Sequence, residues 1–161
     1  MWLVLSDSHD NMDKLKKIPD IIQRYNIDTI FHCGDFVAPF TLPYLIYDDI
    51  DFYGVFGNND GEKLLLYEKS NKKIKNGPIT VEKDGKKIFL MHEPYSLEAA
   101  ENSGIYDYIF FGHTHEIVNR KIGKTFVLNP GEFSGWLTGK ATYGIIDPID
   151  PNEAKVEIKE L

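Results

Sequence analysis

Cysteine is almost absent from this 161-residue chain, in which Cys33 is the only one. No disulfide can therefore form within the chain. Long hydrophobic runs are absent too, since no stretch approaches the roughly 18 apolar residues needed to cross a bilayer. The short apolar run at residues 2–5 has no basic region before it and no small-residue cleavage site after it. We therefore expect a cytoplasmic protein with no membrane partner.

Positive charge is scarce. The chain has 18 Lys and Arg residues against 25 Asp and Glu residues, a formal net charge of −7, and its arginines are Arg24 and Arg120 alone. A surface for long nucleic acid needs clustered Lys and Arg, so no such partner is expected. A bidentate arginine clamp on a phosphate is not indicated either. A small phosphoester stays compatible, because bound divalent ions would reverse the sign of the local field.

The rest of the composition is typical of a globular protein. Hydrophobic residues make up 42% and charged residues 27% of the chain. The length fits one domain of ordinary size. Because we find no internal repeat, low-complexity segment or linker, we predict a single domain over residues 1–161.

The first 60 residues alternate between strand-like and helix-like patterns. Apolar runs predict strands at residues 2–5, 28–32 and 51–56. Apolar residues at helical spacing predict a helix over residues 13–25, which Pro19 would kink or divide into two pieces. Between the second and third strands, residues 38–48 are predicted to be a loop that leads into a short helix.

The pattern after residue 60 is richer in hairpins. Helices are predicted over residues 61–69 and 96–103, and Asp84-Gly85 suits the tight turn of a hairpin. Strands are predicted at residues 78–82, 86–91, 107–111, 117–121, 125–128, 142–146 and 154–159. So many hairpins disfavour a purely parallel sheet. We predict an α/β fold of two mixed β-sheets, packed as a sandwich and flanked by helices.

Side chains that can bind metals follow five of the predicted strands. The set consists of Asp7, His9, Asp35, Asn58, His92, His113 and His115. Each residue alone has a plain explanation, such as a turn or a hydrogen-bonded core histidine. Ligands gather beyond the carboxyl ends of strands in α/β folds, so these side chains could converge. Four of the five histidines belong to the set, and the joint pattern favours a metal site.

The types of ligand indicate the kind of ion. Imidazole nitrogens with carboxylate and amide oxygens, and no thiolate, suit Mn, Fe, Co, Ni or Zn. A carboxylate such as Asp35 can bridge two ions about 3.5–4 Å apart, as in two-metal hydrolases. Such a pair can acidify a bridging water and neutralise charge on a phosphoryl group. We expect two divalent ions, with manganese as the first candidate and nickel, iron, cobalt or zinc as the others.

Five sequence blocks resemble a known family. In order, they are Asp7-Ser8-His9, Gly34-Asp35, Gly57-Asn58-Asn59-Asp60, Met91-His92 and Gly112-His113-Thr114-His115. Together they resemble the calcineurin-like metallophosphoesterase superfamily. They are most similar to its small single-domain branch of archaeal and bacterial phosphodiesterases, which also includes the retromer subunit Vps29. The resemblance extends from Asp7 to about Gly131 and implies a two-sheet α/β sandwich with the metals at one end.

The resemblance also implies a role for each ligand. Asp7, His9 and His115 would hold the first metal, and Asp35 would bridge. Asn58, His92 and His113 would hold the second. Asn11 matches a position close to the first metal, where it would contact the ligands rather than the metal itself. The turn Asn129-Pro130-Gly131 matches one that borders the site in this branch, although it could equally be a plain turn. Trp136, in a Gly-rich run, could border the site or a subunit contact.

Two positions depart from the family pattern. Many members carry His where this chain has Asn59, and that His is proposed to protonate the leaving oxygen. The amide of Asn59 cannot act as an acid. Asp60 is expected to orient the loop. His92 is followed by Glu93 where the family usually has Gly. We hypothesise that Glu93 is either the missing acid or an outer-sphere partner of the metals, which places it with Asp35, Asn58 and His92 among the catalytic residues.

The expected reaction is hydrolysis of a phosphodiester by a hydroxide that bridges two metals. One alternative is a phosphomonoesterase or a nuclease acting on short strands. Another, of a different class, is a non-catalytic Vps29-like scaffold, although a decayed site would be expected to have lost ligands. The expected partner is a small phosphoester. Small domains of this branch often self-associate, so a homo-oligomer is a further expectation.

Overall fold

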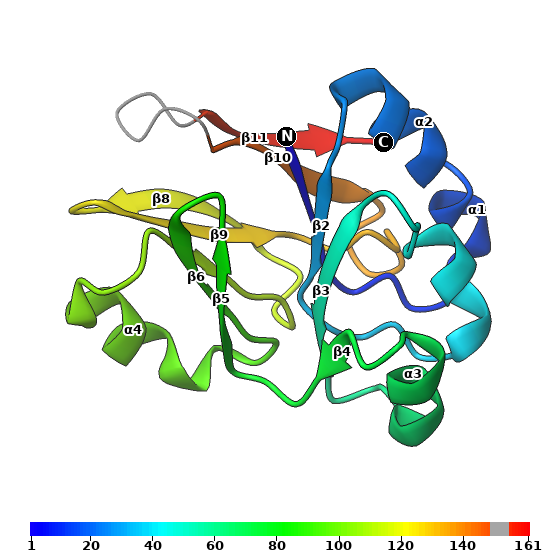
Figure 1. Cartoon of the computed structure of the whole chain (residues 1–161). Coiled ribbons are helices and arrows are strands. Elements are labelled where there is room, and N and C mark those ends of the chain that lie inside the picture. The colour runs from blue at the N-terminus through cyan, green and yellow to red at the C-terminus, as the bar shows by residue number, and fades with distance from the viewer. Residues whose placement is uncertain (149–154) are drawn as a thin grey trace.

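The computed structural model describes residues 1–148 and 155–161, whose strands form two mixed β-sheets (Figure 1). The first sheet has the order β11-β10-β1-β2-β3-β4. Its members are β1 (Trp2–Leu5), β2 (Thr29–His32), β3 (Asp51–Val55), β4 (Ile74–Lys75), β10 (Thr142–Asp147) and β11 (Lys155–Glu160). Strands β1 to β4 are parallel, whereas β10 runs antiparallel to both β1 and β11.

The second sheet has the order β5-β6-β7-β9-β8. Its members are β5 (Ile79–Lys83), β6 (Lys86–Leu90), β7 (Tyr108–Phe110), β8 (Ile117–Ile122) and β9 (Thr125–Pro130). The three inner strands are parallel, and the two outer strands pair antiparallel with their neighbours. The prediction of two mixed sheets is therefore confirmed.

Helices cover the outer face of each sheet, which gives four layers (Figure 1). The first sheet carries α1 (Met12–Leu15), α2 (Ile18–Tyr25), the 3₁₀ helix η1 (Pro39–Tyr44) and α3 (Lys63–Lys69). The second sheet carries the 3₁₀ helix η2 (Pro94–Ser96) and α4 (Leu97–Ser103). None of the described helices is both long enough and apolar enough to span a bilayer.

Strand β1 connects the two cores because its side chains alternate between the faces of the sheet. Leu3 and Leu5 pack under the helices, whereas Trp2 and Val4 belong to the core between the sheets. The Trp2 ring meets Phe31 edge-on at 5.3 Å between ring centroids, and Tyr108 of the other sheet at 5.2 Å. Aromatic contacts of this kind add about 0.5–1.5 kcal/mol each beyond burial of area. They tie β1 and β2 of the first sheet to β7 of the second.

The local predictions are confirmed with small shifts of boundary. The helix predicted over 13–25 is divided in two, and Pro19 lies in the first turn of α2, where its missing N–H costs nothing. Asp84 and Gly85 have φ of 52° and 72°, as the tight hairpin turn requires. The short helix within 38–48 is the 3₁₀ helix η1, and β4 was not predicted. Residue 154 of the last predicted strand lies outside the described residues.

Candidate metal centre

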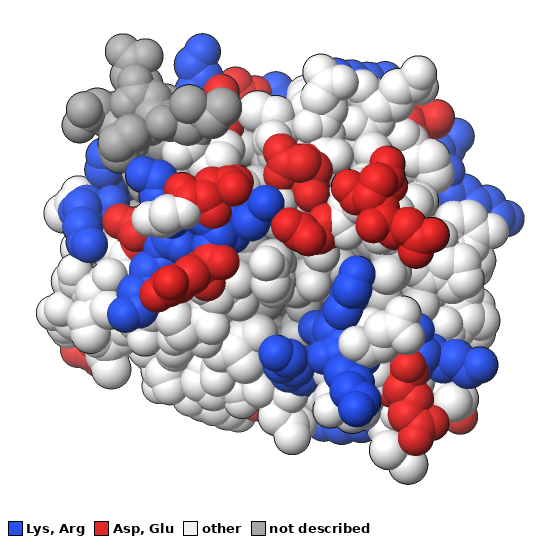
Figure 2. Space-filling model, in the orientation of Figure 1, with Lys and Arg blue, Asp and Glu red and all other residues white. Residues whose placement is uncertain are grey.

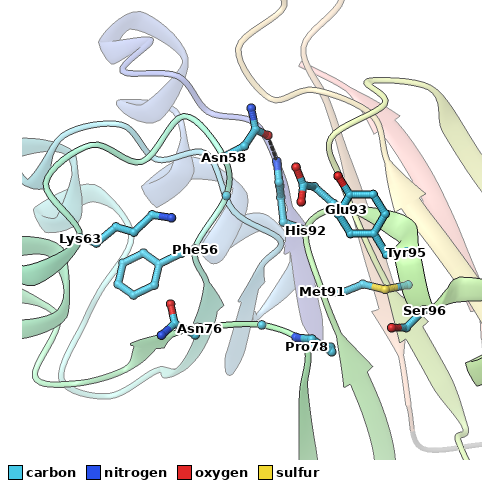
Figure 3. Close-up of a pocket in the computed structure, with 12 residues that line it drawn as sticks. Phe56, Asn58, Lys63, Asn76, Pro78, Met91, His92, Glu93, Tyr95 and Ser96 are labelled. Atoms are coloured by element: carbon cyan, nitrogen blue, oxygen red, sulfur yellow. Dashed lines mark hydrogen bonds between the residues drawn. The ribbon is translucent and has the colours of Figure 1, made fainter.

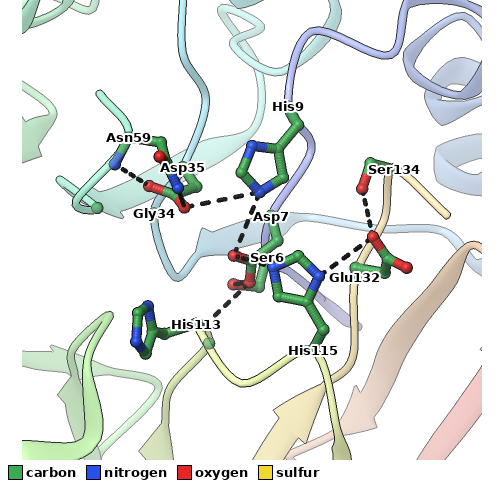
Figure 4. Close-up of polar contacts among 12 residues, drawn as sticks. Ser6, Asp7, His9, Gly34, Asp35, Asn59, His113, His115, Glu132 and Ser134 are labelled. Atoms are coloured by element: carbon green, nitrogen blue, oxygen red, sulfur yellow. Dashed lines mark hydrogen bonds and ion pairs between the residues drawn. The ribbon is translucent and has the colours of Figure 1, made fainter. Parts of the chain in front are cut away.

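The loops that follow β1, β2, β3, β6 and β7 meet at one place. They bring all seven predicted ligands together, although these come from positions as far apart as 7 and 115. Figure 4 shows His9, Asp7, Asp35 and His115 pointing toward one another from three of these loops. The side chains form two clusters that share one carboxylate.

The first cluster consists of Asp7, His9 and His115. Oδ1 of Asp7 lies 3.2 Å from Nε2 of His115 and 3.7 Å from Nε2 of His9. One ligand atom from each residue lies within 4.8 Å of the others, so the three could hold one metal ion. Asp7 is completely buried.

The second cluster consists of Asp35, Asn58, His92 and His113. Oδ1 of Asn58 lies 2.9 Å from Nε2 of His92 and 2.9 Å from Nδ1 of His113. Oδ2 of Asp35 lies 3.4 Å from Nε2 of His92 and 3.6 Å from Nε2 of His9. One oxygen of Asp35 thus faces both clusters, which is the position that a bridging ligand needs.

Buried polar atoms without partners mark the first cluster as a cation site. Within the described chain, Oδ1 of Asp7 and Nε2 of His9 are buried and have no hydrogen-bond partner. Such atoms are rare in folded proteins, because each costs about 1–3 kcal/mol. A divalent ion among Asp7, His9 and His115 would satisfy them. The residues present therefore fit a metal.

The electrostatics of Asp7 and His115 are those of a tightly paired site. Burial alone would raise the pKa of Asp7, but contacts with His115, His9 and Ser6 outweigh burial and hold that pKa below its usual range. The contact with Asp7 raises the pKa of His115, against the opposite effect of burial. Asp7 is therefore an anion, available to pair with a cation.

Asp35 and His92 are coupled in the same way. Burial would raise the pKa of Asp35, but hydrogen bonds from His92 and Asn59 lower it. Burial would lower the pKa of His92, but Asp35 raises it. Nδ1 of His92 lies 2.8 Å from the carbonyl oxygen of Cys33, which accepts a hydrogen bond from it and leaves Nε2 facing Asp35 and Asn58. A second partner of this kind fixes ring orientation and tautomer in metal sites.

Five of the seven predicted ligands have a left-handed backbone. The φ angles are 52° at Asp7, 41° at His9, 60° at Asp35, 67° at His113 and 58° at His115. This region costs an L-residue on the order of 1–2 kcal/mol, although Asp, Asn and His tolerate it better than most. Unfavourable conformations of this kind gather at functional sites, where the surroundings hold them.

Two glycines permit the close approach of these loops. Gly34 has φ of 105°, and a Cβ atom there would lie 2.7 Å from Nδ1 of His92. At Gly112, a Cβ would overlap Oγ of Ser6 and lie 2.8 Å from Oδ2 of Asp7. Only glycine lets the loops after β2 and β7 lie so close to the ligands.

Glu132, which was not among the predicted site residues, is the main support of His115. Its fully buried carboxylate accepts hydrogen bonds from Oγ of Ser134 and from three backbone N–H groups, those of Trp136, Leu137 and Thr138. Its Oε2 lies 3.2 Å from Nδ1 of His115, as an ion pair rather than a well-aligned hydrogen bond. Figure 4 shows Glu132 on the side of the His115 ring that faces away from Asp7.

The loop that follows β3 supports Asp35. The backbone N–H and side-chain amide of Asn59 donate to the two oxygens of Asp35 at 2.8 and 2.7 Å. Asp60 accepts from the N–H groups of Val37 and Gly57, each at 2.7 Å, and so ties two loops together. Asp60 thus has the orienting role expected of it, while Asn59 holds a ligand in place.

The fifth histidine, His32, lies behind the site. It is completely buried, and Nδ1 accepts from the N–H of Gly34 at 3.2 Å, which places the proton on Nε2, 3.1 Å from Oγ of Ser8. Burial lowers the pKa of His32 to about 3. It is therefore a neutral support for the loops after β1 and β2.

The other residues singled out in the sequence lie around this centre or away from it. Asn11 caps α1 and donates to the carbonyl of Ser134. Asn129 donates to the carbonyl of Gly112, beside the His113 loop. Trp136 is 64% exposed and donates from Nε1 to the carbonyl of His9 at 3.2 Å, so it borders the site.

Glu93 and the two arginines differ in their relation to the centre. Glu93 lines a cavity that Asn58 and His92 also line. Arg120 pairs with Glu101 on the surface, and Arg24 lies beside Tyr143. Neither arginine is part of the site, in line with the expectation that no arginine clamps the phosphate.

Known proteins are similar to this chain over nearly its whole length. Residues 1–150 match the calcineurin-like phosphoesterase superfamily domain. Phosphodiesterase MJ0936 of Methanocaldococcus jannaschii is 38% identical over 150 residues, which cover 89% of this chain and 90% of that protein. The structure of an archaeal phosphodiesterase superposes with a TM-score of 0.89 at 35% identity, covering 99% of both chains. Vacuolar protein sorting 29 of Cryptosporidium parvum shares the fold, with a TM-score of 0.70 at 18% identity over 99% of this chain and 96% of that one. The chain belongs to the calcineurin-like phosphoesterase superfamily.

Proposed function

We propose that this protein is a metal-dependent phosphodiesterase that hydrolyses small phosphoric diesters. The observation that carries the proposal is the pair of adjoining donor clusters joined by Asp35. The similarity to the phosphodiesterase of M. jannaschii supports a diester as the substrate.

The donor set assigns a place to each ion. Asp7, His9 and His115 would hold one, Asn58, His92 and His113 the other, and Asp35 would contact both. Two divalent cations there would acidify a water held between them and neutralise charge on the phosphoryl oxygens. Nitrogen and oxygen donors without thiolate favour manganese, with nickel, iron, cobalt or zinc as the alternatives.

The chain's own groups would orient the metal ligands and protonate the leaving group. The carbonyl of Cys33 holds the His92 ring, Glu132 supports His115, and Asn59 holds Asp35. The side chain of Asn59 is an amide, so it cannot replace the acid that other members carry at its position. Glu93 is the carboxylate that lines the adjoining cavity, and we propose it as the proton donor or as an outer-sphere partner of the ions.

The direct test compares metal-free and manganese-loaded protein on bis(p-nitrophenyl) phosphate. We expect hydrolysis only with the metal, and loss of both metal and activity in Asp35→Asn, with the fold retained. Asp49→Asn changes an exposed carboxylate and should behave as wild type. Hydrolysis that persists in the chelated protein or in the metal-loaded Asp35→Asn variant would overturn the proposal.

Three alternatives are separated by related assays. A phosphomonoesterase would turn over p-nitrophenyl phosphate faster than the diester. A short-strand nuclease would cleave oligonucleotides. On the face shown in Figure 2, however, Lys and Arg form small separate clusters, with acidic and uncharged side chains between them, rather than a continuous basic track. A Vps29-like scaffold without catalysis would hydrolyse neither ester with manganese present, whether or not it binds a metal; the convergence of all seven proposed ligands supports the enzyme instead.

A further inference from the structure

The centre opens on one side into a cavity of about 410 Å³, which Asn58 and His92 both line. This volume lies within the range of small-ligand sites, about 300–1,000 Å³. Because two proposed metal ligands form part of its wall, a diester held at the centre would place one of its two organic groups here. The cavity therefore determines which diesters fit.

The walls of the cavity present aromatic rings from opposite sides. Phe56, which follows β3, lies on one side, and Tyr95 of η2 lies on the other (Figure 3). Met91 also lines the cavity. Tyr95 is 85% exposed, so its ring packs on little of the protein itself and is free to stack on a ligand. Flat walls of this kind favour a planar ring as the occupant.

The polar groups of the cavity favour a ring with hydrogen-bonding edges. Asn76 provides both a donor and an acceptor. Among the described residues that line the cavity, Lys63 is the one Lys or Arg and Glu93 the one acidic residue, so the lining has no cluster of basic groups. Nζ of Lys63 lies over the Phe56 ring, 5.8 Å from its centroid, on the side of that ring nearer Asn58 (Figure 3).

This lining disfavours two other occupants. A purely apolar chain would leave the charged and amide groups without partners, which is costly on burial. A second phosphate would meet Glu93 as well as Lys63 and would gain little net attraction. A neutral group with a flat heteroaromatic ring satisfies both the rings and the polar side chains.

We propose that the cavity between Phe56 and Tyr95 is a nucleoside site, and that the preferred substrates are nucleotide diesters whose nucleoside arm stacks there. The inference rests on the proposed diesterase function and adds the substrate class to it. Asn76 would contact an edge of the base, and Lys63 would lie near the phosphate.

The experiment compares two diesters that release the same p-nitrophenolate. One is the p-nitrophenyl ester of thymidine 5′-monophosphate, and the other is methyl p-nitrophenyl phosphate. With manganese-loaded wild type, we expect kcat/KM to be about ten-fold or more higher for the nucleoside ester, the scale of one base stacked on an aromatic ring. The preference should come mainly from a lower KM.

Variants locate the preference in this cavity. Tyr95→Ala should lower the ratio of the two kcat/KM values to near one, and Tyr95→Phe should restore it because the ring is retained. Phe56→Ala should have the same direction, but Phe56 also packs against the core, so the exposed Tyr95 is the decisive position. Phe40→Ala removes a ring that is 57% exposed and does not line the cavity, and it should leave the ratio unchanged.

A binding measurement separates this inference from the proposed function. Isothermal titration of chelated protein with thymidine and adenosine 5′-monophosphates, against methyl phosphate, needs no turnover. If neither ester is hydrolysed but the nucleotides bind in a Tyr95-dependent way, the diesterase proposal fails and the nucleoside site stands. If both esters are hydrolysed equally well, and nucleotides bind no better than methyl phosphate, the nucleoside site is overturned and the diesterase stands. If there is neither hydrolysis nor nucleotide binding, both fail.

Discussion

Oε2 of Glu132 lies 3.2 Å from Nδ1 of His115, while Nε2 of the same ring lies 3.2 Å from Oδ1 of Asp7. The imidazole is thus held between two buried carboxylates, one on each side of the ring. A carboxylate behind a metal-binding histidine fixes its tautomer and raises its basicity.

Glu132→Gln should therefore weaken metal binding. An amide cannot accept from all the donors that surround Glu132, and its N–H₂ would face one of them. We expect the dissociation constant for manganese to rise about 10–100-fold, the usual effect of losing such a partner. A titration with manganese, monitored by circular dichroism, checks this, with the exposed Glu116→Gln as matched control. Unchanged affinity in Glu132→Gln would show that His115 needs no support.

Glu93→Gln tests the proton donor. If Glu93 is the acid, the variant should lose about 10²-fold or more in kcat on diesters with poor leaving groups, and much less on p-nitrophenyl esters, which leave without protonation. The high-pH limb of the rate profile should change as well. If Glu93 is instead an outer-sphere partner, the metal content should fall. Glu98→Gln on α4 is the exposed control, and a Glu93→Gln enzyme with unchanged pH profile and metal content would leave Glu93 without either role.

Metal loading should stabilise the folded protein, because the ions bind sites that exist only after folding. An ion present at 100 times its dissociation constant adds about 2.7 kcal/mol to the free energy of unfolding. Urea unfolding with manganese and with chelator measures the difference. Asp35→Asn should reduce that difference sharply. Identical urea midpoints in both conditions would show that folded wild type does not bind the ion.

His32 should make the metal-free protein less stable at mildly acidic pH. An unfolded His32 takes up a proton near pH 6.5, but burial lowers the folded pKa to about 3. The stability that neutral, buried His32 contributes to the fold is fully present above pH 6.5 and is lost as the pH falls toward 3. The slope is about 1.4 kcal/mol per pH unit.

The window from about pH 6 to 4.5 isolates this effect from the other histidines. His92 and His115 have raised pKa values, so the stability that they contribute is complete below 6.5 and is lost only above it. His32→Asn keeps an acceptor for the N–H of Gly34 but does not titrate in this range. Urea unfolding should show a shallower pH slope in the variant, and equal slopes would contradict the assignment.

The fold was largely predictable because its strands are strongly patterned. Residues 2–5 form a continuous apolar run, and Asp84-Gly85 can hardly form anything but a turn. β4 was missed because it has only two residues, Ile74 and Lys75, too few for any period to show. Its pairing with β3 depends on tertiary contact rather than on local pattern.

The proximity of the seven candidate ligands was predictable for a different reason. Each lies two to five residues beyond the end of a strand, and in each of the two sheets the ends of parallel strands meet at one edge. Glu132 could not be found in this way, because it lies just beyond β9, whose last residues are Asn129 and Pro130 rather than part of a turn, and supports a histidine 17 residues away in another loop. The bond between Asn59 and Asp35 likewise requires the three-dimensional arrangement of two loops.

The left-handed backbone at five of the ligands restricts what could be built from this site. The side chains must suit a metal and the main chain must accept positive φ at the same residue, and Asp, Asn and His satisfy both conditions. Grafting the seven side chains onto another α/β scaffold would fail unless the turns that carry them were grafted too. The transferable unit is therefore the set of loops with their glycines, and a designer should treat the geometry of these turns as part of the ligand set.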